Sequence, residues 1–565
     1  MRPSLRSASL AALLVAALAG CAAIPGSGGV QIAEVAPSDD PVEFDFVPKA
    51  PVPDASPEQI LRGFIDAATS PRGNYEIARE FLTPEFAGQW EPESRVTIDR
   101  LADRDLGTAE PAVDEESAST AMRVSSRPVA GLTATGQYET AESATPIDLP
   151  YSFERVDGQW RISQAPQGIL IDESSFELVF AKHAIYFFDP GFRYLVPDLR
   201  WFAGRDSVQT SIVRALLAGP AEWLQPGVVT AFPDGLRLEP DAVPVTGRVA
   251  SVDLVGSPVD DRLTLQRMQL QLTSSLNAVR SVSDVQLEVN GLVDDAPKLT
   301  APRAPRVDSR SVVFDGEQFG YLAAAGGEIQ TLPGISDQVV QLGPTGAAVG
   351  VDAQSVAVRS EAGVSIVHRG DPAVLLDERD DLIVPAIDEH GIVWSVPADA
   401  PDELFWYDGD ESGPVPVPWD AEQIAALDVS RDGTRLIVLL GTGAHTQFLV
   451  AAVQRDTDGR PVAIGPPVRL DALDGEPADV AWIDGQTVAS LTLGSGGAGT
   501  IVTQEVGGIA GRRSGPDDVV QIDGGNNRRE LRALTADGSL DSQAGVGWQS
   551  RASDIRFVAA QQRVE

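Results

Sequence analysis

The sequence predicts a multidomain protein in which two small α+β domains precede a β-propeller of about six blades. Between residues 56 and 292, apolar residues at helical spacing alternate with period-two strand patterns, which is typical of α+β domains. From about residue 307 onward, short β-rich segments, residues 339–342 among them, recur every 8 to 14 residues or so, and no useful helical period remains. The chain of 565 residues is also too long for one hydrophobic core, so several domains are expected.

The first 20 residues have the features of a secretory signal peptide. Arg2 and Arg6 form a positive segment, and an apolar run from Ala8 to Ala19 follows, broken only by Ser9. The run is shorter than the ~20 residues that a membrane-spanning helix needs. It ends at Leu18-Ala19-Gly20-Cys21, where small residues mark a cleavage point. Cys21 is the single cysteine of the chain, so it has no partner for an intramolecular disulfide.

This segment resembles the bacterial lipoprotein signal. In that resemblance Leu18, Ala19 and Gly20 form the lipobox, and Cys21 becomes the first mature residue, carrying an S-diacylglycerol and an N-acyl group such as palmitate. Two acyl chains suffice for stable attachment, at ~0.8 kcal/mol per buried methylene. The protein is therefore expected on the cell membrane, lipid-anchored and facing outside the cytoplasm. The alternative is an ordinary export signal with an incidental cysteine.

The charge of the chain excludes some classes of partner. Asp and Glu number 82 against 43 Lys and Arg, which gives a formal net charge of −39. No basic stripe is available to neutralise phosphates, so nucleic acid is not an expected partner. Broad adsorption to anionic lipid head groups is disfavoured for the same reason. The body is expected to touch the membrane only through its lipid.

The mature chain is predicted to begin with a linker, residues 21–55, which is rich in Gly at its start and in Pro toward its end. The first α+β domain is predicted over 56–178. Ser56-Pro57 is a helix-start signal, and the apolar spacing that follows predicts a helix over 57–69. A short helix is predicted over 76–81, ending at Thr83-Pro84, and antiparallel strands follow.

The second α+β domain is predicted over 180–292. Strands 184–188 and 193–196 flank Asp189-Pro190-Gly191 as a hairpin. Helices are predicted over 207–218, stopped by Gly219-Pro220, and over 260–280. Residues 293–306, with three prolines, form the next predicted linker.

Residues 307–565 are assigned to the propeller. Two segments about 51 residues apart, 428–436 and 479–487, each join a strand to a second strand through an Asp-Gly turn. The length suits four-stranded blades of ~40 to 45 residues each, which gives about six. Exchange of a strand between the two ends of this region would add one more. A pair of two-sheet sandwiches is the alternative architecture.

The residue patterns of catalysis are largely missing from the sequence. His183, His368, His390 and His445 stand far apart, without metal-ligand spacing. His183 is expected at the surface or in a hairpin, and His445 in a blade turn. The acidic segments 408–411 and 456–459 resemble fragments of calcium loops but lack the later bidentate Glu, so solvated turns are expected. We therefore expect no catalytic residue, no metal and no cofactor.

Taken together, these segments resemble the actinobacterial lipoprotein LpqB family, which has a lipobox, an N-terminal α+β module, a GerMN module and a propeller in this order. The resemblance is carried most specifically by the segments 156–162, 185–190, 193–201 and 214–220. It implies a lipid-anchored accessory protein of the Mtr two-component system. The implied partner is the extracellular domain of a membrane sensor histidine kinase linked to the cell envelope and division.

Three hypotheses of function remain open from the sequence. The first is the lipid-anchored accessory protein that binds and modulates a sensor kinase. The second is an envelope lipoprotein that binds a wall glycan or another small ligand on a propeller face or the central module. The third is a propeller enzyme, a lactonase or hydrolase with a carboxylate-bound metal.

Overall fold

We analysed a computed structural model of the chain. It describes residues 48–110, 114, 116–141, 145–204, 207–293, 297–323, 327–443, 445–494, 497–545 and 547–564. The lipobox residues Leu18, Ala19 and Gly20, and Cys21 after them, lie outside the described residues, so their predicted roles stay predictions. Among the described residues, no helix is long and apolar enough to cross a membrane.

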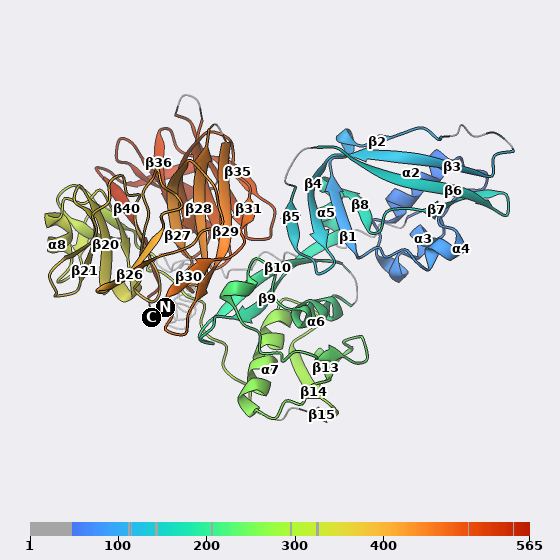
Figure 1. The fold of residues 1–565 in the computed structure, drawn as a ribbon, viewed down its shortest axis with the longest axis horizontal. Helices are drawn as coiled ribbons and strands as arrows, with labels where there is room; N and C mark the ends of the chain where they lie inside the picture. Colours follow the sequence, from blue (N-terminus) through green and yellow to red (C-terminus); the bar gives the residue numbers. More distant parts are fainter. Residues whose placement is uncertain are drawn as a thin grey trace, which may run out of the picture. The chain divides into compact units, whose positions relative to one another are not determined.

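The first α+β module combines four short α-helices with two four-stranded sheets (Figure 1). One sheet has the order β5-β4-β1-β8 and the other β2-β3-β6-β7. The helices are α2 (Pro57–Ala67), α3 (Glu76–Arg79), α4 (Pro84–Ala87) and α5 (Glu173–Val179). The strands are β1 (Arg95–Asp99), β2 (Asp105–Leu106), β3 (Ser119–Ser126), β4 (Pro128–Thr133), β5 (Tyr138–Thr140), β6 (Ile147–Val156), β7 (Gln159–Gln164) and β8 (Ile169–Asp172).

Helix α2 begins where the sequence predicts it. The Ser56 hydroxyl accepts the N–H of Gln59, and the Gln59 side chain accepts the N–H of Ser56, a capping box that satisfies two orphan donors. The prediction for the next helices is partly wrong. Thr83-Pro84 does not end the second helix but starts α4, because the Thr83 hydroxyl accepts the N–H of Phe86 and proline fits the first helical position.

The second α+β module is built on a long antiparallel ribbon. Strands β9 (Phe180–Phe188) and β10 (Leu195–Ala203) pair along their whole length. The predicted hairpin was too short, because Trp201 and Phe202 extend β10 and Phe180 and Ala181 extend β9. Helices α6 (Val208–Ala218) and α7 (Arg262–Leu276) pack on the ribbon, and α7 ends earlier than the predicted residue 280. The remaining sheet contains β11 (Arg237–Leu238), β12 (Val245–Thr246), β13 (Val249–Val255), β14 (Asp284–Val289) and β15 (Leu292–Val293).

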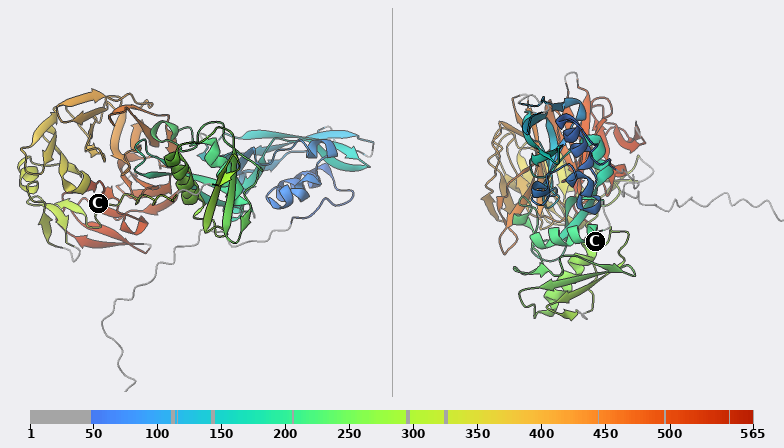
Figure 2. Two further views of the ribbon diagram at one scale, coloured as in Figure 1. Left: turned by 90° about the horizontal axis from the view of Figure 1, so that it is seen from below. Right: turned by 90° about the vertical axis from the view of Figure 1, so that its right-hand side faces the viewer.

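Beyond residue 307 the described residues form six blades arranged in a ring, five of four strands and one of five, which confirms the predicted propeller of about six blades (Figure 2). The C-terminal strand β40 (Phe557–Gln561) pairs with β16 (Val312–Phe314) and thus completes the first blade. This is the strand exchange that the sequence analysis considered, and it closes the ring without adding a blade.

The blades follow each other along the chain. The first contains β16, β17 (Phe319–Leu322), β18 (Ile329–Thr331) and β40, and the second β19 (Gly346–Val349), β20 (Ser355–Ser360), β21 (Gly363–His368) and β22 (Val374–Asp377). The third contains β23 (Ala386–Ile387), β24 (Val393–Ser395), β25 (Phe405–Asp408) and β26 (Glu411–Pro414). The fourth contains β27 (Gln423–Val429), β28 (Arg435–Thr442), β29 (His445–Arg455), β30 (Pro461–Ile464) and β31 (Val468–Leu470). The fifth contains β32 (Glu476–Trp482), β33 (Thr487–Leu493), β34 (Gly499–Glu505) and β35 (Gly511–Ser514), and the sixth β36 (Val519–Asp523), β37 (Arg532–Thr535), β38 (Leu540–Ala544) and β39 (Gly547–Ala552).

One predicted propeller strand is a helix. Residues 339–342, expected as a strand from their apolar β-branched residues, belong to α8 (Ser336–Gln341) and its cap. The Ser336 hydroxyl donates to the carbonyl of Phe319 and accepts the N–H of Leu332, and Val339 is fully buried. Packing against the first blade therefore overrides the strand propensity of the valines.

We expect Phe557→Ala to destabilise the closure of the ring. The Phe557 ring lies 5.4 Å from that of Phe314 and 6.3 Å from that of Phe319, and its side chain is buried. Removing a buried Phe side chain costs about 3–5 kcal/mol. Urea unfolding followed by tryptophan fluorescence should show the propeller transition at a lower midpoint. Phe405→Ala, at a half-buried position on β25, is the control and should cost less. Equal losses in both variants would contradict the role assigned to β40.

Candidate functional site

The innermost strands of the six blades enclose a well on the propeller axis. Their order around the ring is β40, β19, β23, β27, β32 and β36, as their pairings and mutual contacts show. The well has a volume of about 370 Å³. One end is lined by the exposed residues Val520 and Arg556, and the other by Asp428, Arg431 and Asp523.

Three side chains of the inner strands link three successive pairs of blades. The Asp428 carboxylate accepts the N–H of Trp482 at 3.2 Å, and the Asp479 carboxylate accepts the N–H of Ile522 at 2.9 Å. The Gln521 side chain accepts the N–H of Val558 at 3.0 Å. These bonds join the fourth blade to the fifth, the fifth to the sixth and the sixth to β40. The acidic residues of the well therefore have a structural role in holding the ring together.

Burial makes these carboxyl groups hard to ionise. Desolvation raises the pKa of Asp428 and that of Asp479 to about 7, against the opposing effect of the N–H groups that bind them. It also raises the pKa of Asp523, which is partly offset by an ion pair with Arg532 at 2.8 Å. Arg431 donates to the carbonyl of Trp482 at 3.0 Å, and burial lowers its pKa.

The end of the well near Asp428 is crossed by the side chain of Gln562, the residue that follows β40. The Gln562 side chain donates to the carbonyl of Val429 at 3.3 Å, and this carbonyl belongs to the fourth blade. In a ring of six, β27 lies three blades from β40, on the opposite side of the axis. The carbonyl of Arg563 accepts the N–H of Asp352, and Val564 pairs with Arg306. We call residues 562–564 the crossing segment, and we call the end of the well that the Gln562 side chain covers, near Asp428, its floor.

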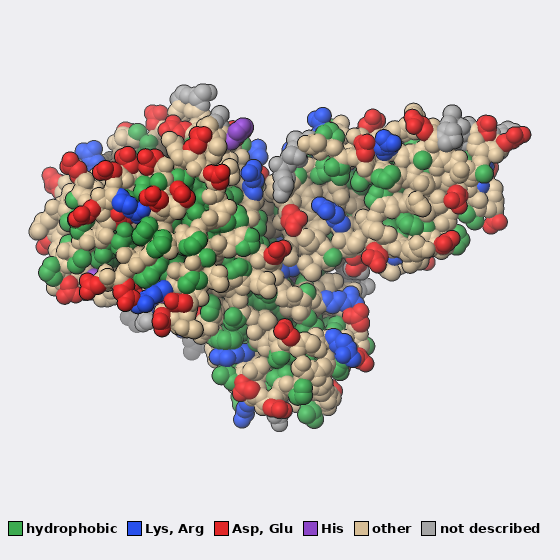
Figure 3. Space-filling model, in the orientation of Figure 1, with side chains coloured by type: hydrophobic (Ala, Val, Ile, Leu, Met, Phe, Trp, Pro, Cys, Tyr) green, Lys and Arg blue, Asp and Glu red, His purple; other side chains and the backbone are tan. Residues whose placement is uncertain are grey.

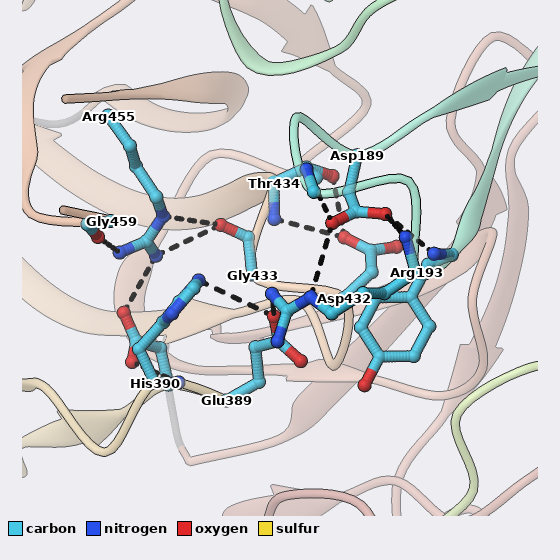
Figure 4. Close-up of polar contacts among 12 residues, drawn as sticks. Asp189, Arg193, Glu389, His390, Asp432, Gly433, Thr434, Arg455 and Gly459 are labelled. Atoms are coloured by element: carbon cyan, nitrogen blue, oxygen red, sulfur yellow. Dashed lines mark hydrogen bonds and ion pairs between the residues drawn. The ribbon is translucent and has the colours of Figure 1, made fainter. Parts of the chain in front are cut away.

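The tip of the β9–β10 hairpin meets the same side of the propeller (Figure 4). The Asp189 carboxylate shapes the tip by accepting the N–H groups of Gly191, Arg193 and Tyr194. This local turn aims Arg193 at Glu389, which lies in the turn between β23 and β24, and the two side chains form an ion pair. We call this group of contacts between the hairpin tip, the propeller turns and the crossing segment the joint.

Glu389 is the most constrained charged group of the joint. Its side chain has no exposed surface, whereas that of Arg193 is about half exposed. Its Oε1 lies 3.4 Å from Nε2 of His390, and its Oε2 lies 3.9 Å from Nε of Arg563 on the crossing segment. Oε2 and that Nε have no hydrogen-bond partner among the described residues. Desolvation raises the pKa of Glu389 to about 7, although Arg193 and the Tyr194 hydroxyl oppose the shift.

The neighbouring charges are already neutralised. Asp388 accepts from Arg455 at 2.7 Å and from the indole of Trp394. Asp432 is paired with Arg435, and its carboxylate also accepts from Thr434. Burial lowers the pKa of His390, which favours its neutral form. Glu389 therefore stands out as a buried acid whose hydrogen bonding is incomplete.

The rest of the ribbon also contacts the propeller. Lys182 of β9 forms an ion pair with Glu505 at 2.6 Å, and the indole of Trp201 donates to the carbonyl of Gly507 at 2.9 Å. A Cβ at Gly227 would lie 2.7 Å from the carbonyl oxygen of Thr434, so only glycine permits this approach. The N–H of Trp201 also donates to the carbonyl of Gly136 in the first module. One ribbon thus contacts the first module and the propeller while it belongs to the second module.

The structure separates the predicted candidates. His183 lies on β9 of the β9–β10 hairpin, one of the two places expected for it, and it is buried because its place in the ribbon faces inward. His368 and His445 are exposed on separate blades, and His390 alone lies in the joint. Residues 408–411 and 456–459 are turns, as expected, and Asp456 accepts the N–H groups of Asp458 and Arg460. Within the described ranges, no group of three His, Cys, Asp or Glu side chains is placed to hold a metal.

Sequence reasoning missed Glu389, Arg193 and Arg563 as a group. A signal existed for Arg193, because Asp189-Pro190-Gly191 predicts a tight turn that presents the following residues. Glu389 carries no such signal in a chain with 82 acidic residues, and Arg563 lies 174 positions further along.

The fold defines a class of protein: two α+β modules joined through a shared ribbon to a six-bladed propeller. Three family models match the chain in the same order. They are the N-terminal domain of lipoprotein LpqB over residues 50–177, a sporulation and spore germination domain over 184–295, and the β-propeller domain of lipoprotein LpqB over 321–556. The chain belongs to the LpqB lipoprotein family.

Individual relatives of the chain belong to the same family. The chain is 30% identical to lipoprotein LpqB of Cutibacterium acnes over 59% of its own length and 57% of that protein. It is 27% identical to lipoprotein LpqB of Mycobacterium leprae over 83% of each chain. A solved nidogen/laminin complex is similar with a TM-score of 0.32 and 11% identity, over 44% of this chain and 95% of that one. The β-propeller domain of Cps50 (Swd1) from Myceliophteria thermophila is similar with a TM-score of 0.29 and 14% identity, over 40% of this chain and 74% of that one.

We expect Asp479→Ala to destabilise the propeller in a pH-dependent way. The variant leaves the N–H groups of Val480 and Ile522 without their acceptor, at a cost of about 1–3 kcal/mol for each buried donor. Because the pKa of Asp479 is raised on folding, the wild-type carboxyl contributes most at low pH, and its contribution is lost as the pH rises through about 7.

Thermal unfolding at pH 5 and pH 8 measures this effect. The gap between wild type and Asp479→Ala should be wide at pH 5 and narrow at pH 8. Asp458→Ala, at an exposed turn, is the control and should change neither melting temperature. A gap that widens with pH would show that the ionised carboxylate is the stabilising form.

Proposed function

We propose that this protein is a lipid-anchored accessory protein outside the cytoplasm that binds and modulates the extracellular domain of a membrane sensor histidine kinase of the Mtr type. Membership of the LpqB lipoprotein family, together with the lipobox that ends at Cys21, is the observation that carries the proposal. We further propose the domain boundaries 56–178, 180–292 and 307–565 for its three modules.

The anchor would place the protein beside its partner. Residues 21–55 number 35, and a chain of this length spans at most ~120 Å when fully extended. Holding two proteins on one membrane raises their effective concentration, so a modest intrinsic affinity is enough for binding. The acidic surface visible on the face drawn in Figure 3 fits a body that touches anionic lipid only through the tether.

The shared ribbon supports a modulating role. A protein shifts the equilibrium of a sensor by the difference between its affinities for the two sensor states. That difference is larger when the binding surface is held rigidly, because less of the binding free energy is spent on ordering it. The contacts of Lys182, Trp201 and Arg193 hold the second module against the propeller in this way.

A second candidate function rests on the well. An envelope glycan or another small ligand would enter by the end at Val520 and Arg556 and meet Asp428 and Arg431 at depth. Thermal shift with soluble peptidoglycan fragments tests this candidate, and a saturable rise would favour it. Ala425→Phe, which fills space in the lining, should abolish the rise if the ligand binds there. The absence of a shift in the wild type would reject this use of the well.

We predict that Cys21→Ser releases the protein from the membrane while its domains stay folded. Serine has no thiol to acylate, so neither lipid chain is attached and the anchoring free energy is lost. Fractionation of cells, followed by immunoblotting of membrane and soluble fractions, measures the effect. Ala22→Ser keeps the thiol and is the matched control. Membrane retention of Cys21→Ser would reveal a different anchor.

We predict that cross-linking in native membranes joins the protein to the kinase ectodomain. In proteoliposomes, the lipidated protein should change the autophosphorylation rate of the kinase, and Cys21→Ser should need a much higher concentration for the same change. No cross-link, with unchanged kinase output in both forms, would overturn the proposed function.

A further inference from the structure

We propose that the joint is proton-linked: protonation of Glu389 keeps the hairpin tip and the crossing segment seated on the propeller, and its ionisation loosens both and uncovers the floor of the well. This inference is independent of the proposed partner. It rests on the place of one buried carboxyl group between three parts of the chain, which are the β9–β10 hairpin, the propeller turns and residues 562–564.

The first step of the argument is the incomplete bonding of Glu389. Arg193 binds Oε1, and the Tyr194 hydroxyl also favours the charged carboxylate, but no donor of the described residues meets hydrogen-bond geometry at Oε2. Nε of Arg563 lies 3.9 Å from Oε2, beyond hydrogen-bond range. A buried carboxylate oxygen without a donor costs much more free energy when charged than when neutral.

The second step is the balance of the charges that face Glu389. The hairpin presents Arg193, Tyr194 and Asp189, and Asp189 disfavours a second negative charge. The turn of the third blade presents His390 and Asp388, and the fourth blade presents Asp432 and Arg455. Asp388 is paired with Arg455 and Asp432 with Arg435, so these charges largely cancel. The crossing segment presents Arg563. The desolvation of Glu389 therefore outweighs the attraction of the guanidinium groups of Arg193 and Arg563, in agreement with the raised pKa of Glu389.

The third step is the sign of the linkage. A glutamate exposed by undocking has an ordinary pKa near 4.5, and the docked one has a pKa of about 7. Docking therefore takes up a proton between these values, so docking is strongest at low pH and weakens as the pH rises through about 7. From pH 6 to pH 8 the docking equilibrium should weaken about tenfold.

The fourth step connects the joint to the well. Four hydrogen bonds between described residues hold the crossing segment: the N–H groups of Gln562 and Val564 donate to the carbonyls of Val349 and Arg306, the Gln562 side chain donates to the carbonyl of Val429, and the carbonyl of Arg563 accepts from Asp352. Its link to the joint is Arg563, which faces Glu389 and Tyr194. When Glu389 no longer favours the docked state, the seating of this segment weakens together with that of the hairpin tip, and the floor beside Asp428 becomes accessible to water.

Hydrogen exchange on the full chain tests the proposal. The amides of Gln562 and Val564 donate to the carbonyls of Val349 and Arg306, so they report directly on seating of the segment. Their protection factors, corrected for intrinsic exchange, should fall about tenfold from pH 6 to pH 8. The amide of Phe192, which donates to the carbonyl of Asp189, reports on the hairpin tip in the same experiment.

Three variants test whether the fall in protection comes from Glu389. Glu389→Gln cannot ionise and should keep high protection at both pH values. Glu361→Gln, at an exposed turn of the second blade, should behave as the wild type does. His390→Asn removes the other titratable group in contact with Glu389, and it should also keep the wild-type fall.

Arg193→Gln provides a test that does not depend on the folding of Glu389→Gln. Arg193 lowers the pKa of Glu389, so its removal should raise the pKa of the docked carboxyl. The midpoint of loosening should therefore move to higher pH in Arg193→Gln. Constant protection in the wild type, a fall that persists in Glu389→Gln, or a fall that disappears only in His390→Asn would each overturn the proposal.

Discussion

The β9–β10 ribbon is the element on which the arrangement of the described contacts depends. Its residues divide between two cores: Phe180, Trp201 and Ala203 belong to that of the first module, whereas Ile185, Phe187 and Val196 belong to that of the second. Successive residues of a strand point their side chains to opposite faces of the sheet. One ribbon can therefore contribute side chains to two cores by using both of its faces and both of its ends. Lys182 and Trp201 of the ribbon, and Arg193 of the turn that joins its strands, contact the propeller through their polar groups.

This sharing explains why a domain boundary is hard to place here. The predicted domains 56–178 and 180–292 have their border near residue 179, but Phe180 is already part of β9 and still packs in the core of the first module. The first module is therefore covalently continuous with the ribbon and cannot lose it without exposing Phe176 and Trp201, whose rings lie 5.0 Å apart. Apolar surface of this size is costly to expose to water. We expect the first two modules to unfold together.

Much of the fold was readable from the sequence, because its signals are local. Ser56, Pro57 and Gln59 start α2, Gly219 ends α6, and Asp-Gly turns at regular intervals indicate blades. Errors arose where distant contacts decide. The strand expected at residues 339–342 is a helix because of the contacts of Ser336 with Phe319 and Leu332, and His183 is buried because its position on β9 faces inward.

The candidate site was less predictable for the same reason. Asp428 and Asp479 stood out in repeated segments, but their role as bridges between blades depends on N–H groups that lie 54 and 43 positions away. Glu389 depends on Arg193 and Arg563, which flank it at distances of 196 and 174 positions. Only the closed ring brings these residues together, since β40 must return to the first blade before residue 563 can reach the third.

Ring closure and the joint are consequently one physical problem. The pairing of β40 with β16 fixes where the chain leaves the propeller, and that point lies on the axis side of the first blade. The backbone of the next residues binds Val349, Asp352 and Arg306 beside the first two blades, whereas the Gln562 side chain reaches the carbonyl of Val429 across the well. Arg563 then faces Glu389, a buried acid that also binds the hairpin. A change at Glu389 therefore acts on the ribbon and on the floor of the well at the same time, which no exposed ion pair of this acidic surface would do.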